Sequence, residues 1–505
     1  TMSLREHALS LFRGAVGSVR PAPMLKRALK LQENGCPQLL VKGQAFPVKR
    51  DLYLVGFGKA VLGMAAAAEE ILGDHLTRGI INVPLGIQES LQRAGMQEML
   101  LKPQSKIQVI EGAKNNLPDA EALKGAAAIL ELAKGLTADD LLLVLISGRG
   151  GSALLPAPIP PILLKEKEKL TKVLASRGAA IQELNIVRKS LSMLKGGGLA
   201  QLAHPAQVVS LILSDVIGDP LDIIASGPTA ASSHTVQDCL QILTKYNLLH
   251  NLPKSVEMVL SSSPTKPTAP ENYSHVSNII LGSNSLALEE AKHQAEGLGY
   301  AALVLSAAVQ GEVSCVATLY CELIQLVCLG FASHGEGPLS DELRGNLLQL
   351  AAELQIPGLD LDEFLQALQR LGPDRPVCIL AGGETTVQLQ GTGKGGRNQE
   401  LALRVGLGLH KALATGASSP QGRCEILFLS GGTDGQDGPT EAAGAFCSPG
   451  LVAEALQEGL DVEAFLRNND SYTFFSQFQG GRHLLVTGLT GTNVMDIQAI
   501  LIRAM

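Results

Sequence analysis

The chain has 505 residues, of which 54 are glycine, 46% are hydrophobic and 18% are charged. This composition excludes a disordered or fibrous protein, and the length predicts two or three domains of ~100–200 residues each. The formal net charge is −7 and aromatic residues make up only 3%. Nucleic acid and anionic membranes are therefore not expected as partners.

Three apolar runs in the first half of the chain predict strands that end in polar turns. Leu52–Val55 leads into Gly-Phe-Gly-Lys, Leu141–Ile146 into Ser-Gly-Arg-Gly-Gly-Ser, and Val208–Leu213 into Ser-Asp-Val. Because these runs are continuously apolar, we expect strands that are buried on both faces. The recurring order of strand, polar turn and helix predicts an α/β domain with a mostly parallel sheet over residues 1–260.

A second series of strands follows a segment of linker composition. Residues 261–275 are rich in serine and proline, which is typical of a linker. Further strands are predicted at Asn278–Leu281, Ala302–Leu305, Cys378–Leu380 and Ile426–Leu429. The chain is therefore expected to form two α/β domains, with the second over residues 276–505.

The longest apolar run, Cys315 to Ala332, is interrupted by Glu322 and Gln325 and is expected to be a buried helix of a soluble domain. The eight cysteines form no C-x-x-C pair and the ten histidines show no ligand spacing, so no zinc site is expected. No apolar core of a secretory signal opens the chain. These features favour an intracellular protein with reduced thiols, in the cytoplasm or the mitochondrion.

The densest group of glycine and charged residues lies at 381–400. It satisfies the dinucleotide fingerprint G-x-G-x-x-G, but no acidic residue ends the next strand about 20 residues on, so that interpretation is rejected. Instead, Gly395, Gly396 and Arg397 precede a helix, with Glu384 upstream, which is typical of a cradle for phosphate. The alternative is a glycine-rich hairpin with solvated charges.

A second glycine-rich segment, residues 430–444, carries Asp434 and Asp437 just after an apolar run. Two carboxylates at the end of a strand suit a Mg²⁺ ion that bridges phosphates, and one of them could accept a hydroxyl proton as a general base. The alternative is a turn in which the aspartates bond to their own backbone.

The first domain also carries candidate binding residues just after its predicted strands. Lys59 lies at a strand-to-helix turn, where an anion would meet the helix N-terminus, although an ordinary surface lysine would look the same. The loop 147–152, Asp215, and Lys195 before three glycines are further candidates, and the last could equally mark a helix C-cap. P-loop, protein-kinase and G-x-S-x-G motifs are absent from the sequence.

Six motifs together resemble those of the class II glycerate kinases, which carry a C-terminal MOFRL domain. In this sequence they are Gly56–Ala60, Leu213–Pro220, Ala225–Thr229, Gly382–Val387, Gly395–Glu400 and Ser430–Thr440. The likeness covers essentially the whole chain in matching order, looks closest to the animal members, and places the MOFRL region at about 376–500.

The resemblance implies ATP- and Mg²⁺-dependent phosphorylation of D-glycerate, with 2-phosphoglycerate favoured as the product, in carbon metabolism linked to serine, fructose and glyoxylate. It also implies a Rossmann-like N-terminal domain and a distinct α/β C-terminal domain, with the active site in the cleft between them. Small molecules are the expected partners, and a homodimer is left open.

By the same resemblance, Lys59 and Arg397 match basic residues at the reacting phosphate, and Asp434 completes the expected catalytic set. Asp434 and Asp437 are the expected Mg²⁺ ligands. Contacts with substrate or nucleotide are expected at Ser147, Gly150, Gly151, Ser152, Lys195, Asp215, Asn284, Glu384, Gly395, Gly396 and Asp437.

Two alternatives stay open at this point. Related sequences are also described as hydroxypyruvate reductases, so an NAD(P)-dependent reductase is the competing enzyme, although a ribose-binding acid is missing. Arg149 makes the loop 147–152 one residue longer than the Ser-Gly-Gly-Gly-Ser of the family. A non-catalytic sensor of small acids on the same scaffold would also fit that insertion.

Overall fold

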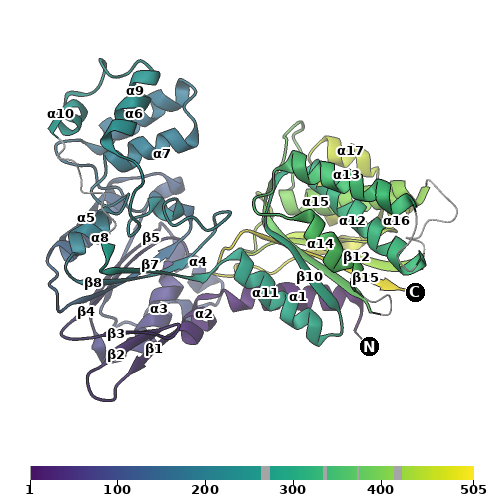
Figure 1. Ribbon diagram of the computed structural model, residues 1–505, viewed down its shortest axis with the longest axis horizontal. Helices are drawn as coiled ribbons and strands as arrows, with labels where there is room; N and C mark the ends of the chain where they lie inside the picture. Colours follow the sequence, from purple (N-terminus) through teal and green to yellow (C-terminus); the bar gives the residue numbers. More distant parts are fainter. Residues whose placement is uncertain (1, 263–272, 334–337, 372–374, 415–422) are drawn as a thin grey trace. The chain divides into compact units, whose positions relative to one another are not determined.

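The computed structural model describes residues 2–262, 273–333, 338–371, 375–414 and 423–505. The chain forms two compact units (Figure 1). One comprises Pro21–Leu281, and the other comprises Thr1–Arg20 together with Gly282–Met505.

The unit Pro21–Leu281 is built on a six-stranded sheet with the order β6-β5-β4-β7-β8-β9. Its strands are β4 (Leu52–Phe57), β5 (Leu76–Pro84), β6 (Ile107–Gly112), β7 (Leu141–Ser147), β8 (Gln207–Leu213) and β9 (Val276–Gly282). All pairings from β6 to β8 are parallel, and every residue of β7 is buried. The predicted α/β class with a mostly parallel, doubly covered sheet is confirmed.

Helices and a small sheet surround this parallel sheet. The helices are α2 (Pro21–Ala28), α3 (Val61–Leu72), α4 (Ile87–Arg93), α5 (Ala120–Lys134) and α8 (Gly198–Ala203), and the antiparallel sheet consists of β1 (Leu29–Gln32), β2 (Gln38–Val41) and β3 (Gln44–Pro47). Four helices form a group with its own apolar core, at the upper left of Figure 1: α6 (Leu164–Ser176), α7 (Ile181–Ser190), α9 (Val236–Lys245) and α10 (Lys254–Ser262).

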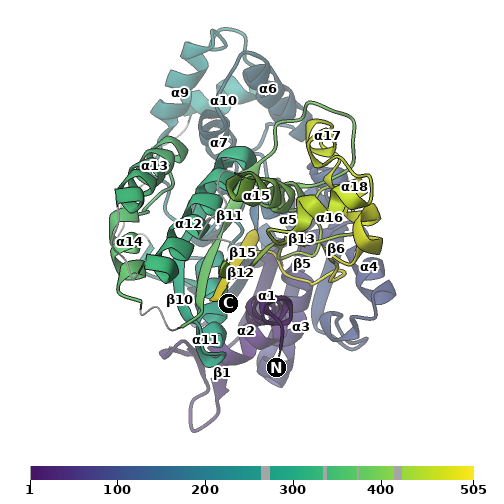
Figure 2. The ribbon, with the colours of Figure 1, turned by 90° about the vertical axis from the view of Figure 1, so that its right-hand side faces the viewer.

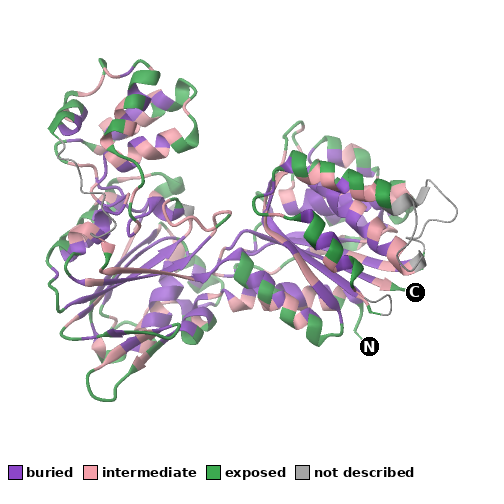
Figure 3. Ribbon diagram, in the orientation of Figure 1, coloured by how far each residue is buried: buried purple, intermediate pink, exposed green. Residues whose placement is uncertain are grey.

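The other unit contains a mixed sheet with the order β10-β11-β15-β12-β13-β14. Its strands are β10 (Ala301–Glu312), β11 (Val377–Thr386), β12 (Cys424–Gly432), β13 (Gly444–Cys447), β14 (Leu484–Leu485) and β15 (Asp496–Ala504). The last strand of the chain, β15, lies antiparallel between β11 and β12. It therefore occupies the middle of the sheet, and Figure 3 shows the strands of both sheets as largely buried.

Helices cover both faces of the mixed sheet. In Figure 1, α1 (Leu4–Ser18) and α11 (Asn284–Gly297) lie below it, and α12 (Val313–Ser333), α13 (Pro338–Leu354) and α15 (Arg397–Ala414) lie above it. Figure 2 turns the same ribbon by 90° and shows α15 near α16 (Leu451–Gln457). The remaining helices of this unit are α14 (Leu361–Gln369), α17 (Val462–Arg467) and α18 (Ser471–Gln477).

The units differ from the predicted domains, 1–260 and 276–505, at two places. Helix α1 packs on α11, β12 and β15, so the N-terminal residues belong with the later part of the chain. Strand β9 completes the first sheet beside β8. An amphipathic helix or a lone apolar strand does not encode which sheet it joins, because that choice depends on long-range packing. Residues 263–272 of the predicted linker lie outside the described residues.

Helix α12 contains the apolar run noted in the sequence. Val313–Phe331 is, among the described residues, the one helical segment long and apolar enough to cross a membrane, and 56% of its most apolar window is buried. Its buried side chains, including Val316, Leu323 and Ile324, belong to the core formed with α15 and the mixed sheet. This packing agrees with the predicted buried helix.

Candidate active site

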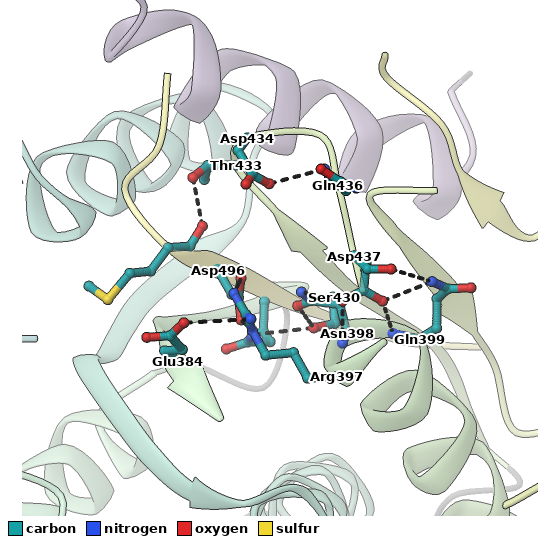
Figure 4. A network of polar contacts seen from close by, with 12 residues as sticks. Glu384, Arg397, Asn398, Gln399, Ser430, Thr433, Asp434, Gln436, Asp437 and Asp496 are labelled. Atoms are coloured by element: carbon teal, nitrogen blue, oxygen red, sulfur yellow. Dashed lines mark hydrogen bonds and ion pairs between the residues drawn. The ribbon is translucent and has the colours of Figure 1, made fainter. Parts of the chain in front are cut away.

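Arg397, the first residue of α15, is held in place by Asp496 at the start of β15. The guanidinium Nε lies 2.5 Å from Asp496 Oδ2 and Nη2 lies 2.9 Å from Oδ1, so the two groups pair through two parallel hydrogen bonds (Figure 4). Nη1 lies 3.5 Å from Glu384 Oε1. The Asp496 side chain is 1% exposed and that of Arg397 is 32% exposed. One edge of the guanidinium is thus fixed while part of it stays open to solvent.

The register of the mixed sheet explains why these side chains meet. Asp496 is the Cα partner of Gly383 on β11 and of Gly432 on β12. Glu384 follows Gly383 at one neighbouring strand end, and Asp434 lies two residues beyond Gly432 at the other. Each of these three strands therefore places an acidic residue at the same end of the sheet, where β11 and β12 end and β15 begins.

Burial and ion pairing both shift the pKa values of Arg397 and Asp496. Burial by itself lowers the pKa of Arg397, but the hydrogen bonds and charge of Asp496, followed by the charge of Glu384, outweigh it and hold this pKa above its usual value. Burial raises the pKa of Asp496 to about 6, despite the opposing effect of Arg397. Both groups are therefore charged at neutral pH, and the guanidinium is a fixed positive charge.

Asp437 caps helix α15. Its Oδ1 accepts hydrogen bonds from the backbone N–H (3.0 Å) and the side-chain amide (3.1 Å) of Asn398. Its Oδ2 accepts from the backbone N–H and the side-chain amide of Gln399, both at 2.9 Å. The residue is 1% exposed, and burial raises its pKa in spite of these bonds. Its oxygens are occupied, so the predicted role of Asp437 as a Mg²⁺ ligand does not fit this geometry.

The spacing of the two aspartates could not reveal this cap, because its partners lie about 40 residues earlier in the chain. Two glycines allow the close approach that it requires. A Cβ atom at Gly396 would lie 2.4 Å from Asp437 Cγ, and one at Gly395 would lie 2.3 Å from Ser471 Oγ. Because these two glycines have no side chain, the segment before α15 can pack closely against Asp437 and Ser471.

The predicted phosphate cradle has fewer backbone amides available to an anion than the sequence suggested. The backbone N–H groups of residues 390–394 donate to the Asn468 backbone carbonyl and to the side chains of Asn468, Asn469 and Asp470. Within the described residues, the N–H groups of Gly395 and Gly396 donate to no acceptor. The amides available to an anion are thus those next to Arg397 and the start of α15.

Asp434 is half-buried just beyond the end of β12. Its Oδ1 accepts a hydrogen bond from the Gln436 backbone N–H at 3.0 Å, which is the turn considered as the alternative interpretation. Thr433 ties this turn to the segment before β15, since its N–H and its hydroxyl donate to the Met495 carbonyl at 2.9 and 2.6 Å (Figure 4). Asp434 therefore stands near the Arg397–Asp496 pair with one oxygen committed to the turn.

Asn284, the first residue of α11, contacts the backbone at the start of β15. It is 2% exposed, and its side-chain amide donates to the backbone carbonyls of Val494 (2.9 Å) and Asp496 (2.8 Å). This geometry supports the backbone at Asp496 and leaves the buried Asn284 Oδ1 without a hydrogen-bond partner among the described residues, and the contact of Asn284 with substrate or nucleotide stays a prediction. Asp496 itself was not among the predicted site residues, although an acidic residue stands at the start of the last apolar run.

In the other unit, two predicted elements meet at the ends of β4 and β7. Ser147 is 4% exposed, and its Oγ accepts a hydrogen bond from the Ala60 N–H at 2.9 Å. Gly58 has φ +138°, and a Cβ atom there would lie 2.3 Å from the Ser147 carbonyl oxygen. The neighbouring Lys59 is exposed. The Lys59 turn and the loop 147–152 are therefore adjacent, as expected for neighbouring parallel strands.

The loop 147–152 also contacts the loop that follows β8, and that loop in turn contacts the segment after α7. Gly150 and Gly151 lie in a 3-10 turn that ends at Ser152, whose Oγ lies 2.8 Å from Ser226 Oγ. A Cβ atom at Gly148 would lie 2.8 Å from an oxygen of Asp215. The Gly196 N–H donates to the Ser226 carbonyl at 2.9 Å, which brings the chain beside Lys195 to the same place.

Comparisons with known proteins show which family the chain belongs to. Residues 7–261 match the "Domain of unknown function (DUF4147)" and residues 377–496 match the MOFRL family. The chain is 62% identical over 501 residues to a glycerate kinase of Rattus norvegicus, covering 99% of this chain and 93% of the relative. The chain belongs to the glycerate kinase family. The resemblance inferred from the motifs is confirmed.

More distant members of the glycerate kinase family share the whole architecture. The chain is 31% identical over 500 residues to a glycerate 2-kinase of Pyrococcus horikoshii, with 98% of this chain and 97% of the relative covered. The crystal structure of a glycerate kinase from Thermotoga maritima superposes with a TM-score of 0.74 at 30% identity, over 99% of both chains. The assignment as a kinase is confirmed, and the reductase alternative is not favoured.

Proposed function

We propose that this chain transfers the terminal phosphoryl group of ATP to the 2-hydroxyl of D-glycerate, giving 2-phosphoglycerate and ADP. The observation that carries the proposal is the guanidinium of Arg397, fixed by Asp496 beside the two amides of Gly395 and Gly396. The name of the Pyrococcus horikoshii relative, a glycerate 2-kinase, supports the choice of hydroxyl.

Arg397 would stabilise the charge on the transferring phosphoryl oxygens. Phosphoryl transfer depends mainly on positioning and on neutralising the charge spread over those oxygens. A guanidinium that is oriented before the substrate arrives needs no reorganisation during the reaction. The amides of Gly395 and Gly396 and the positive end of the α15 dipole would bind the same phosphate.

Lys59 would supply a second positive charge to the phosphoryl group. Its ammonium group is exposed at the turn between β4 and α3, next to the loop 147–152. The predicted contacts of Ser147, Gly150, Gly151, Ser152 and Asp215 with glycerate or nucleotide stay part of this proposal. Backbone amides and hydroxyls of such a loop suit a carboxylate or a phosphate.

Asp434 is the carboxylate that we assign to Mg²⁺ or to the hydroxyl proton of glycerate. Mg²⁺ bound with ATP is usually held by one or two carboxylates, water and the phosphates, so one half-buried aspartate fits this ion. Among the described residues no group of three His, Cys, Asp or Glu side chains could hold a metal ion. Water and the phosphates of ATP would therefore supply the other ligands. When bound, the ion would neutralise charge on the phosphates, while Arg397 and the amides position them.

The reaction can be tested with purified protein, ATP, Mg²⁺ and D-glycerate. We expect ³¹P NMR to show 2-phosphoglycerate and ADP in equal amounts. A 3-phosphoglycerate signal would overturn the regiochemistry and leave the kinase intact. Incubation with NADH and hydroxypyruvate is the control for the reductase, and we expect no oxidation of the cofactor.

A further inference from the structure

A buried chain of hydrogen bonds runs from helix α12 to the start of helix α15. The Tyr320 hydroxyl donates to Gln498 Oε1 at 2.9 Å, and Gln498 Nε2 donates to Ser430 Oγ at 3.3 Å. The Ser430 hydroxyl donates to Asn398 Oδ1 at 2.7 Å, and Asn398 Nδ2 donates to Asp437 Oδ1 at 3.1 Å (Figure 4). The four donors lie on α12, β15, β12 and α15, so the bonds join four elements of one unit.

The hydrogen bonds can run in one direction only. Both oxygens of Asp437 already accept backbone N–H groups of α15, so this carboxylate is the acceptor at the end. Asn398 must therefore turn its amide nitrogen toward Asp437 and its amide oxygen toward Ser430. The Ser430 oxygen is then left to accept from Gln498, whose own amide oxygen accepts from Tyr320. Removing any one hydroxyl leaves a buried polar group without its partner.

The surroundings of these hydrogen bonds are apolar. All five side chains are between 0% and 2% exposed, and Tyr320 belongs to the core that α12 forms with α15 and the mixed sheet. Burial, followed by the charge of Asp496, raises the pKa of Tyr320, so its hydroxyl stays protonated and can donate. A buried polar network is costly when incomplete, and when complete it holds its members in a single arrangement.

Strand β15 connects this network to the catalytic arginine. Asp496 and Gln498 are two residues apart on β15, so their side chains point to the same face of the sheet. Asp496 pairs with the guanidinium of Arg397. Gln498 is the Cα partner of Ser430, which in turn bonds to Asn398, the residue after Arg397. One strand therefore fixes both the guanidinium and the first turn of the helix that carries it.

We infer that Tyr320, Gln498 and Ser430 are positioning residues for phosphoryl transfer. They hold Asn398, and with it the start of α15, so that the guanidinium of Arg397 keeps its orientation toward the phosphoryl group. Because all three side chains are buried, they act through Arg397 and not on the substrate itself. The inference rests on the proposed function for the role of Arg397.

The first test is steady-state kinetics of Tyr320→Phe and Ser430→Ala in the full chain. Each substitution removes one hydroxyl and leaves the rest of the side chain in place. We expect kcat to fall about tenfold, which is less than the ~10²-fold that a misplacement of 1 Å can cost. The KM values for ATP and D-glycerate should change little, because an interaction that matters only in the transition state affects kcat. Wild-type kcat in folded Tyr320→Phe would overturn the inference.

Tyr300→Phe is the matched control. Tyr300 is 2% exposed, and its hydroxyl lies 2.8 Å from His7 Nδ1. It precedes β10, at the end of the sheet opposite to Glu384. Both tyrosine variants lose one buried hydrogen bond, so we expect similar decreases in Tm but a lower kcat only in Tyr320→Phe. An equal loss of kcat in Tyr300→Phe would mean general destabilisation and would overturn the inference.

A double variant shows whether the network acts through Arg397. When Arg397→Ala is already present, Tyr320→Phe should lower kcat no further, because no guanidinium is left to position. A second tenfold loss in the double variant would place the effect of Tyr320 elsewhere and would contradict the inference.

Hydrogen exchange provides a readout that does not depend on turnover. Mass spectrometry should show faster exchange of the amides at 397–402 in Tyr320→Phe and Ser430→Ala than in the wild type and Tyr300→Phe. Unchanged exchange at these positions would show that the network does not hold the start of α15. A failure of the kinase proposal would appear separately, as absence of phosphoglycerate from the wild-type protein.

Discussion

The guanidinium of Arg397 and the carboxylate of Asp496 are joined by two hydrogen bonds, of 2.5 and 2.9 Å, although 99 positions separate the residues in the chain. Asp496 is buried and Arg397 keeps about a third of its side chain exposed. The pair therefore presents an oriented positive charge at the end of the mixed sheet where β15 begins.

Replacing Arg397 should mainly affect the chemical step. For Arg397→Ala we expect kcat to fall by about 10²-fold or more, in the range seen when one preorganised donor is removed from a transition state. Arg397→Lys should rescue little, because an ammonium group cannot reproduce the two parallel bonds to Asp496. Steady-state kinetics and circular dichroism of both variants provide the measurement. Normal turnover in folded Arg397→Ala would refute the role of Arg397.

Protonation of Asp496 should reduce activity on the acid side. Its folded-state pKa is about 6 and its ordinary value is 3.8, so kcat should decline below about pH 6 as the partner of Arg397 loses its charge. Asp496→Asn should have a low kcat without this acid limb. A pH–rate profile of the two proteins from pH 5 to 8 decides this, and an identical limb in the variant would assign it to another group.

The same pKa has the opposite consequence for stability. Because the pKa of Asp496 is raised on folding, the folded state binds this proton more readily, and the penalty of the buried charge is relieved as the pH falls from about 6 toward 4. Relative to Asp496→Asn, the free energy of unfolding of the wild type should rise by about 1 kcal/mol between pH 7 and pH 5. Urea denaturation at both pH values measures it. A relative loss of stability on acidification would mean that ion pairing dominates burial.

Asp437 and Asp434 should respond differently to the same substitution. Asp437→Asn removes part of a buried helix cap and should lower the free energy of unfolding by about 1–3 kcal/mol, with little change in the Mg²⁺ concentration needed for half-maximal rate. Asp434→Asn should raise that concentration and lower kcat while leaving stability nearly unchanged. Titration of activity with Mg²⁺, together with denaturation curves, compares the two. An increased Mg²⁺ requirement in Asp437→Asn alone would restore the original prediction for that residue.

Lys59 and Arg397 should be coupled in activity if they act on one phosphoryl group. Lys59→Ala should lower kcat without changing stability, because the side chain is exposed. The double variant should lose less than the product of the single effects, since groups that act as a unit are not additive. Lys49→Ala, another exposed lysine of the same unit, is the matched control. Strict additivity of the Lys59 and Arg397 effects would argue for separate roles.

The sequence alone determined the fold class, because continuous apolar runs followed by glycine turns and helices have few other structural solutions. Its motifs also pointed to the kinase family and to Arg397. These features are local, so a single stretch of chain carries the whole signal.

Only the tertiary structure decided which side chains meet. Placing β15 between β11 and β12 brings Asp496 to Arg397, the direction of the Asp437 carboxylate makes it a cap rather than a metal ligand, and α1 joins the sheet built from the end of the chain. Strand order and helix docking are set by packing between residues far apart in sequence, and a slip of one residue in register would turn Asp496 to the other face of the sheet.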